Sequence, residues 1–390
     1  MDNFKFCSPT RYILGKGVED EVGAETRRLG AVALLHYGGG SIKRSGLYER
    51  VLASLKQAGV KVVELSGVQP NPRLSLVQEG IDLVRREGVE VILAVGGGST
   101  IDSAKAIAMG AAYEGNVWDF YSGAAQPQAA LPVGVVLTIP AAGSEGSPDS
   151  VITNEDGWLK RGATGDVIRP AFALMNPELT FTLPPYQTGA GSTDIMVHIL
   201  ERYFTNVDHV ELTDRLCEAT LKTMIDNVPV VLDNPTDYDA RAEIMWAGTV
   251  AHNGLLNTGR LGDWASHAIE HELSALYDVA HGAGLAVIVP AWMRYVYQAN
   301  LPRFIQYATR VWNVEMNYDN PERTALEGIR RTKEFFRLIG MPTTFAELGV
   351  PSDRIEEMAR KAVLDGPLGH FKELHEQDVA AIYRIAAEQA

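Results

Sequence analysis

Two groups of residues in the second half of the chain have the types and spacing of metal ligands. Asp194 and His198 lie four positions apart, as do His267 and His271, and His281 follows ten positions later. A spacing of four places both members of a pair on one face of a helix. Two such helices packed together would bring one carboxylate and two or three imidazoles to a single point. This donor set suits Fe(II) or Zn(II), and neither group contains the cysteines of a closed structural zinc site. We therefore expect a catalytic metal.

Each group taken alone has a simpler interpretation. A single Asp/His pair with this spacing is usually a surface pair that stabilises its helix. His281 precedes Gly282 and Gly284, where a histidine at a helix end or turn is common. The combination favours the metal site, because apolar or small residues surround both groups and buried polar side chains are costly unless something pairs them.

The elements that must position these residues follow from the hydrophobic pattern. From residue 30 to about residue 180, short β-branched runs alternate with amphipathic stretches. This alternation predicts a parallel, doubly wound sheet. The expected strands cover residues 31–35, 60–65, 89–95 and 133–139. The expected helices cover residues 46–58, 74–87 and 99–112.

Other parts of the chain have different patterns. Residues 151–160 are expected to form a hairpin that turns at Asp156 and Gly157. Residues 4–14 are expected to form a strand that must pair with a sheet edge. After residue 185 the β-branched runs nearly vanish, which predicts helices. We expect a dinucleotide-binding α/β domain over residues 1–185 and a helical, metal-binding catalytic domain over residues 186–390.

Two glycine clusters each follow an expected strand. Residues 38–41 read Gly-Gly-Gly-Ser, and residues 96–100 read Gly-Gly-Gly-Ser-Thr. Glycines let the backbone approach a ligand closely, and Ser99 or Thr100 can cap the helix that begins there. Exposed N–H groups at such a helix start bind phosphate. A triple glycine can also be a plain tight turn, but two clusters at strand ends of one parallel sheet favour a nucleotide site.

The residues after the first cluster bear on the choice of nucleotide. Lys43 and Arg44 lie where the adenosine ribose would be, and residues 37–41 contain no acidic side chain. Two cations there favour a 2′-phosphate, so NADP(H) is expected, with NAD(H) as the alternative. The simpler interpretation of Lys43 and Arg44 is a solvated helix start.

These motifs together resemble the iron-containing (group III) alcohol dehydrogenases. The matching segments are residues 96–105 (Gly-Gly-Gly-Ser-Thr-Ile-Asp-Ser-Ala-Lys), residues 138–145 (Thr-Ile-Pro-Ala-Ala-Gly-Ser-Glu) and the aspartate–histidine set. The resemblance covers essentially the whole chain. It is nearest to the NADPH-dependent butanol dehydrogenase and broad-range aldehyde reductase branch, whose first glycine loop reads Tyr-Gly-Gly-Gly-Ser, as residues 37–41 do here.

The resemblance implies a dehydroquinate-synthase-like fold, α/β plus all-α, with the metal between the two domains. It also implies roles for particular residues. The implied metal ligands are Asp194, His198, His267 and His281, and His271 is the candidate to relay the proton of the alcohol. An alternative role for His271 is a hydrogen-bonded partner of a ligand. The expected cofactor contacts are Gly38, Gly39, Gly40, Ser41, Lys43, Asn71, Gly97, Gly98, Ser99, Asp102, Thr138, Lys160 and Leu179. One departure is Ala142, where the family usually has threonine.

Composition excludes several classes of function. The 390 residues carry a formal net charge of −14, which leaves no basic surplus for a nucleic-acid partner. No apolar stretch is long enough to span a membrane, and no secretory leader is apparent, so a cytoplasmic location is expected. Two cysteines fit a reducing compartment.

We expect a metal-dependent dehydrogenase or reductase of primary aliphatic alcohols, such as butanol, and their aldehydes, acting as a homodimer. The alternative is a sugar-phosphate cyclase or lyase of the dehydroquinate synthase type. It would need more lysines and arginines around the metal than Arg202, Arg260 and Arg294, and its family has Glu in place of the Asp ligand.

Overall fold

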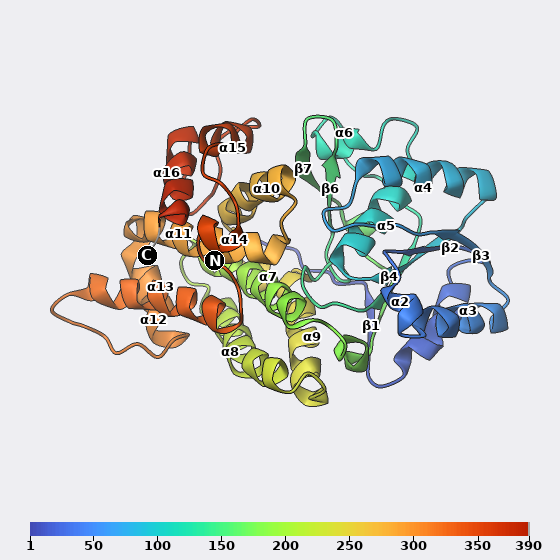
Figure 1. The fold of residues 1–390 in the computed structure, drawn as a ribbon, viewed down its shortest axis with the longest axis horizontal. Coiled ribbons are helices and arrows are strands. Elements are labelled where there is room, and N and C mark those ends of the chain that lie inside the picture. Colours follow the sequence, from blue (N-terminus) through green and yellow to red (C-terminus); the bar gives the residue numbers. More distant parts are fainter. Residues whose placement is uncertain (389–390) are drawn as a thin grey trace. The chain divides into compact units, whose positions relative to one another are not determined.

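The computed structural model describes residues 1–388, and their contacts divide the chain into two units. One unit comprises Cys7–Thr182 and is called here the sheet unit. The other comprises Met1–Phe6 and the chain from Leu183 onward, and is called the helical unit. Figure 1 shows the strands in the first and the long helices in the second.

The sheet unit is built around six parallel strands, a sheet that was expected from the alternating pattern. Their order across the sheet is β1 (Arg11–Leu14), β8 (Phe172–Met175), β5 (Val133–Leu137), β4 (Val91–Gly96), β2 (Val32–Tyr37) and β3 (Lys61–Leu65). In β4 and β5 every residue is buried, as in strands covered on both faces.

Helices and a hairpin complete this unit. The helices are α1 (Val22–Arg27), α2 (Ser41–Arg44), α3 (Leu47–Gln57), α4 (Leu74–Glu87), α5 (Gly98–Ala111) and α6 (Trp118–Tyr121). Short 3-10 turns are η1 (Val18–Glu21), η2 (Asp166–Ile168) and η3 (Pro177–Thr180). The expected hairpin forms from β6 (Asp149–Asn154) and β7 (Leu159–Thr164) and is antiparallel.

The strand expected over residues 4–14 is wrong for most of its length. Only Arg11–Leu14 is a strand, and it pairs in parallel with Phe172–Met175 of the same sheet. The first residues attach instead to the helical unit: the Asp2 N–H donates to the Gly259 carbonyl at 2.9 Å. Phe4 and Phe6 alternate like strand residues but stay exposed, since the described chain offers them no strand partner.

The helical unit consists of helices joined by turns and loops, the longest of which covers residues 363–375. The helices are α7 (Pro185–Tyr203), α8 (Glu211–Asp233), α9 (Tyr238–His252), α10 (Ala265–Tyr277), α11 (His281–Val296), α12 (Leu301–Arg310), α13 (Pro321–Leu338), α14 (Phe345–Leu348), α15 (Ile355–Ala362) and α16 (Glu376–Ala387). The 3-10 turns are η4 (Leu255–Asn257) and η5 (Tyr297–Asn300).

Helices α7 and α11 lie at the centre of this unit. From Thr188 to Tyr203 every residue of α7 is buried, and α7 packs against α8, α9 and α11. Helix α11 is buried along nearly its whole length and also packs against α10 and α16. Polar residues on these helices are therefore held away from bulk water, where an unpaired polar group is costly.

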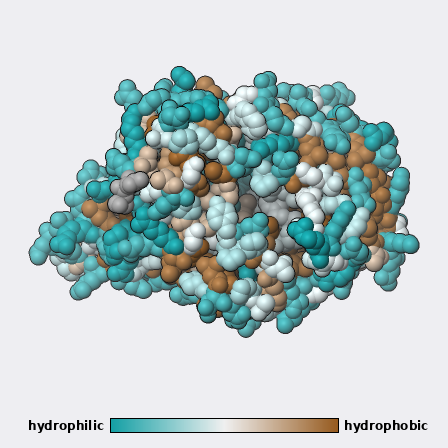
Figure 2. All heavy atoms as spheres, viewed as in Figure 1, coloured by the Kyte–Doolittle hydropathy of each residue, from teal (hydrophilic) through white to brown (hydrophobic). Residues whose placement is uncertain are grey.

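The surface has the pattern of a folded domain exposed to water. Hydrophilic side chains cover much of the face in Figure 2, and apolar side chains interrupt it in patches. Along residues 1–388, no helix combines the length and apolar character needed to cross a membrane.

Candidate metal centre and nucleotide site

Three helices of the helical unit bring the predicted metal ligands together. Asp194 and His198 lie on α7, His267 is in the first turn of α10, and His281 is the first residue of α11. Glycines at the start of α11 allow the close approach. A Cβ on Gly282 would overlap the Ala190 carbonyl of α7, where the backbone itself would have to move.

The side chains converge on one carboxylate oxygen. The Oδ1 atom of Asp194 lies 3.8 Å from Nε2 of His267, 3.7 Å from Nε2 of His281 and 3.2 Å from Nδ1 of His198. Asp194, His267 and His281 form a group whose potential ligand atoms all lie within 4.8 Å of one another. His198 is adjacent, with its ring centroid 4.6 Å from that of His267.

This donor set fits a divalent metal. Among the described residues, Asp194 Oδ1 and His267 Nε2 are buried polar atoms without a hydrogen-bond partner. Native structures rarely leave such atoms unsatisfied, and a bound ion that pairs with them is one of the standard explanations. One carboxylate with imidazole nitrogens is a donor set for Fe(II) or Zn(II).

Titration of these groups reflects their mutual contacts. Burial lowers the pKa of His267, but the nearby carboxylate of Asp194 and the hydrogen-bonded carboxylate of Glu201 outweigh this and raise it to about 9. Burial, together with the charge of His252, holds the pKa of His198 well below its usual value. Burial raises the pKa of Asp194, yet the neighbouring His267 ring and the charge of His281 lower it overall.

His271 lies beside the cluster, one turn beyond His267 on α10 and half-buried. Its ring centroid is 5.5 Å from that of His281 and 6.4 Å from that of His267. With Glu270 and His281 it forms a second group of potential ligand atoms within 4.8 Å of one another. This location suits a proton relay. Because His271 could also be a ligand in the second group, its role has to be distinguished by experiment from that of the ligands.

Two buried glutamates near the histidines were not found from the sequence. Glu201 accepts a hydrogen bond from Nδ1 of His267 at 2.8 Å, and Glu270 contacts Nδ1 of His281. Each glutamate lies three positions after a histidine of its own helix, which is a helix-face spacing. This spacing could have pointed to the two glutamates. However, each carboxylate contacts a histidine of another helix and not the histidine of its own helix.

The two glycine clusters lie at the switch point of the sheet. Strand β2 has β3 on one side and β4 on the other, so the chain reverses its direction of travel across the sheet between β2 and β4. Residues 38–41 follow β2, and residues 97–99 follow β4. Doubly wound sheets bind ligands at the carboxyl ends of the strands at such a switch point. Thr138 also follows a neighbouring strand, β5, and its N–H donates to the Gly96 carbonyl at 3.0 Å.

The second cluster opens the long helix α5. Gly97 is the N-cap residue, and no side-chain hydrogen bond caps this helix in the structure. The expectation that Ser99 or Thr100 would cap it is wrong: both lie inside the helix. Added Cβ atoms at Gly97 and Gly98 would lie 3.0 Å from Ile139 and Ala142, so the backbone packs closely there. A helix start without a side-chain cap leaves N–H groups for an anion.

The first cluster has a more open setting than the second. Nothing lies within 4 Å of an added Cβ at Gly39. The Lys43 ammonium lies 4.7 Å from the ring centroid of Tyr48. The Tyr48 hydroxyl donates to Glu64 at 2.8 Å, and the Tyr37 hydroxyl does so at 3.0 Å. Glu64 could not be found from residues 37–41 of the sequence, because it belongs to the neighbouring strand β3.

The remaining predicted cofactor residues are partly engaged with one another. Lys160 on β7 donates to the Asn71 side chain at 3.0 Å. Asp102 on α5 accepts from the Val151 N–H at 3.0 Å and from the Ser144 hydroxyl at 2.5 Å. These bonds brace α5 against β6 and the loop before it. Leu179 packs against the apolar core of the sheet unit.

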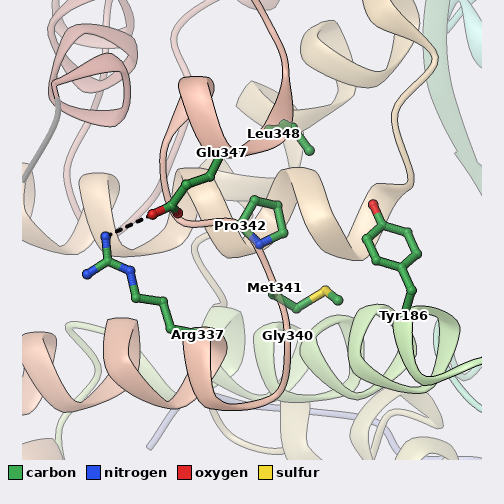
Figure 3. A pocket seen from close by; sticks show the side chains of 7 residues that line it. All are labelled: Tyr186, Arg337, Gly340, Met341, Pro342, Glu347 and Leu348. Atoms are coloured by element: carbon green, nitrogen blue, oxygen red, sulfur yellow. Dashed lines mark hydrogen bonds and ion pairs between the residues drawn. The ribbon is translucent and has the colours of Figure 1, made fainter.

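A surface pocket of about 590 Å³ lies elsewhere in the helical unit. Figure 3 shows its lining, in which Arg337 and Glu347 form an ion pair of 3.2 Å on one side and Tyr186 lies on the other, with Met341 between them. None of the histidines or carboxylates of the metal cluster lines this pocket. This pocket is therefore separate from the cluster on α7, α10 and α11.

Comparison with known proteins agrees with this geometry. The family model for iron-containing alcohol dehydrogenase matches residues 9–177, and the model for the C-terminal part of that family matches residues 188–387. A probable NADH-dependent butanol dehydrogenase of Bacillus subtilis is 44% identical over 99% of this chain and 100% of its own length. The NADPH-dependent aldehyde reductase of Escherichia coli is 36% identical over 93% of each chain. The crystal structure of NADH-dependent butanol dehydrogenase A from Thermotoga maritima superposes with a TM-score of 0.96 at 41% identity, covering 100% of this chain and 99% of that one.

Proposed function

This chain belongs to the iron-containing alcohol dehydrogenase family, and we propose that it interconverts primary aliphatic alcohols and aldehydes using a divalent metal and NADP(H). The observation that carries the proposal is the convergence of His267 and His281 on a buried carboxylate oxygen of Asp194 that has no hydrogen-bond partner among the described residues. We assign the metal to these residues and His198, with Fe(II) as the expected ion and Zn(II) as the alternative.

The chemistry divides between bound groups and the chain. The metal supplies a Lewis acid that polarises the aldehyde carbonyl, and the nicotinamide supplies or accepts the hydride. Asp194 and the three histidines would hold the ion, and the burial of Asp194, His198 and His267 would keep water from three of its ligands. The half-buried His271 is the proposed relay for the proton that the alcohol oxygen gains or loses.

The residues of the sheet unit would hold the nucleotide. The uncapped start of α5 at Gly97 and Gly98 is the proposed pyrophosphate site. The proposed adenosine ribose site is the loop of residues 38–41 with Lys43, and the proposed remaining contacts are Asn71, Ser99, Asp102, Thr138, Lys160 and Leu179.

The sugar-phosphate alternative receives no support from the arginines near the cluster. Arg202 donates to the His198 carbonyl at 2.7 Å, and Arg260 pairs with Asp214 at 2.7 Å. The third, Arg294, lies over the Tyr297 ring at 5.4 Å. A site that holds a substrate phosphate needs cations directed at it, and these three are engaged in packing the helical unit.

The direct test is the loss of NADPH absorbance when the purified enzyme, loaded with Fe(II), receives butanal. We expect oxidation of NADPH that requires both the aldehyde and the protein, and reduction of NADP in the reverse direction with butanol. Absence of turnover with a series of short aliphatic aldehydes, in protein shown to contain metal, would contradict the proposed function.

The preference for NADPH over NADH rests on the loop after β2. Lys43 and a serine hydroxyl offer charge-assisted hydrogen bonds to a 2′-phosphate. The negative charge of Glu64, which accepts from the hydroxyl of the Tyr48 that Lys43 lies over, works in the opposite sense. The named relatives divide between the two cofactors, so the loop alone carries this part of the proposal.

Gly39→Asp tests this loop through charge rather than crowding, because an added Cβ at Gly39 meets nothing within 4 Å. We expect kcat/KM for NADPH to fall about tenfold, the equivalent of one such hydrogen bond, with little change for NADH. Gly39→Asn is the neutral control of the same size. Equal or higher kcat/KM with NADH in the unmodified enzyme would overturn the preference and leave the dehydrogenase proposal intact.

A further inference from the structure

The outer nitrogens of two of the proposed ligands face buried carboxylates. Nδ1 of His267 meets Glu201, and Nδ1 of His281 meets Glu270. The exposed fraction is 2% for the Glu201 residue and 0% for Glu270. Placing two further carboxylates in a protein interior is costly unless each is well hydrogen-bonded. The hydrogen-bond partners of each glutamate therefore indicate its role.

Glu201 connects α7 to the start of α10. Besides Nδ1 of His267, it accepts from the backbone N–H groups of Trp264 at 2.7 Å and His267 at 3.0 Å, and from the Ser266 hydroxyl at 2.5 Å. Helix α10 therefore receives its N-terminal cap from another helix. The same carboxylate that fixes the helix start also fixes the imidazole, and this explains why His267 keeps its position relative to Asp194 on α7.

Glu270 makes the corresponding connection from α10 to α11. Its carboxylate contacts Nδ1 of His281 and the hydroxyl of Ser274, one turn further along α10. A Cβ on Gly284 would overlap the Glu270 carboxylate, so α11 must have glycine there for the glutamate to reach His281. The contact between Glu270 and His281 therefore needs the carboxylate of α10 and the glycine of α11 together.

We propose that Glu201 and Glu270 are positioning residues of the metal centre, which fix His267 and His281 with Nδ1 protonated and Nε2 aimed at the ion. This inference rests on the proposed function, since it requires that the cluster bind a metal. A carboxylate accepts hydrogen bonds and cannot donate, so it holds the proton on Nδ1. The Nε2 lone pairs then point toward Asp194 Oδ1, and the negative partners increase the basicity of the imidazoles as ligands.

His198 differs from the other two and provides a contrast within the site. Its Nδ1 lies 2.9 Å from the backbone carbonyl of Asp194, on its own helix, which no side-chain substitution can remove. The glutamates therefore act on the two ligands that come from α10 and α11. We expect these two ligands to be the ones whose hold on the metal depends on residues outside the ligand set.

The experiment measures Co(II) binding by the metal-depleted full chain in three variants, Glu201→Gln, Glu270→Gln and Glu272→Gln. Glu272 is the matched control: it is buried on α10 two residues after Glu270 and pairs with Lys361 at 3.4 Å. Glutamine keeps the size and removes the charge. We expect Co(II) affinity to fall roughly ten- to a hundredfold in the first two variants and to stay at the wild-type value in the third. The visible spectrum of bound Co(II) should shift in the first two variants only.

The stability of the metal-free proteins in urea separates positioning from a general role in folding. Glu201→Gln also weakens the cap of α10, so some loss of stability is expected there. Glu270→Gln should weaken Co(II) binding with a small change in metal-free stability. Wild-type Co(II) affinity and spectrum in both Glu201→Gln and Glu270→Gln would overturn the inference. The same holds if their Co(II) affinity falls no further than that of Glu272→Gln. Failure of the unmodified chain to bind Co(II) would instead contradict the proposed metal site itself.

Discussion

At the scale of single residues, the metal centre depends on how each imidazole is oriented. His267 has a carboxylate at each nitrogen, Glu201 at 2.8 Å from Nδ1 and Asp194 at 3.8 Å from Nε2. The longer distance leaves room for an ion between Nε2 and Asp194, whereas the shorter one is a hydrogen bond. The two nitrogens therefore have different tasks.

The residues of this cluster could be predicted from sequence to different degrees. Asp194, His198 and His267 were recognised because a four-residue spacing has a direct geometric meaning on a helix. His281 also belonged to the candidate group, but its choice as a ligand in place of His271 required the resemblance to a family, since His281 begins a separate helix. Glu201 and Glu270 were missed because their partners belong to another helix, and a single sequence does not give the contacts between helices.

His271 can be distinguished from the ligands by substitution. His271→Ala should retain metal and lose about a hundredfold in kcat, because it removes a proton relay and leaves the ion in place. Metal content and kcat are measured on the same preparation, and added imidazole should restore part of the rate. Loss of metal in this variant would show that His271 is a ligand, with Glu270 and His281 as its partners.

His36 makes the sheet unit sensitive to acid. Its ring is fully buried between the Leu65 carbonyl at 3.0 Å from Nδ1 and the Ser103 hydroxyl at 2.9 Å from Nε2. Burial lowers the pKa of His36 to about 4, although the hydrogen bond to Leu65 raises it slightly. Between pH 6.5 and about 4 the unfolded chain binds the proton more readily than the folded one, so stability falls as the pH falls through this window.

Because of His36, the free energy of unfolding should fall by about 2 kcal/mol between about pH 7 and about pH 5. Urea denaturation at both values measures it. The variant His36→Asn should be less stable at neutral pH but should lose about 2 kcal/mol less on acidification. An unchanged difference between the two pH values in that variant would exclude His36 as the source.

At the scale of elements, local sequence patterns predicted the bounds of single helices and strands better than the pairing between strands. The strands and helices of the sheet unit begin and end close to the expected residues; for example, α4 covers Leu74–Glu87 as predicted. The strand expected over residues 4–14 was wrong for residues 4–10. An alternating pattern shows that a segment can form a strand, but it does not show how long the neighbouring strand is. Here β8 is four residues long and pairs with Arg11–Leu14 only.

The packing of α11 against α7 gives a prediction at this scale. Gly282→Ala should destabilise the helical unit by roughly 2 kcal/mol, because the added carbon overlaps the Ala190 backbone and the helices must separate. It should also weaken metal binding, since His281 is the adjacent residue. Urea denaturation and metal content measure both effects.

Gly162→Ala is the control for this substitution. An added Cβ at Gly162 on β7 would lie at ordinary contact distance from Val151, at 3.7 Å. It should therefore cost little stability and leave the metal in place. If Gly282→Ala behaves like this control, the close packing of α7 and α11 does not position His281.

At the scale of the whole molecule, we expect two copies of the chain to associate. Sheet edge β1 follows a segment in which Phe4 and Phe6 are 53% and 46% exposed. Exposed large apolar side chains that are close in sequence can mark an interface. Light scattering at micromolar concentration should give twice the mass of the chain. The double substitution of Phe4 and Phe6 by serine should shift the mass toward the monomer, and a monomeric unmodified protein would contradict this prediction.

The charge of the whole molecule also affects what it binds. A net charge of −14 repels polyanions, and the expectation that it binds no nucleic acid stands on that charge alone. The nucleotide phosphates instead need local positive sites, and we propose that the start of α5 and Lys43 provide them within an acidic protein.

The central claim is that the cluster on α7, α10 and α11 binds a divalent metal on which turnover depends. The direct measurement removes metal with a chelator, restores Fe(II) without oxygen, and follows NADPH oxidation by butanal in the wild type and in His267→Ala. The account predicts that activity disappears with the metal and returns with one Fe(II) per chain in the wild type, whereas the folded variant neither retains metal nor regains activity. Full activity in the metal-free wild type, or full activity and metal content in His267→Ala, would contradict it.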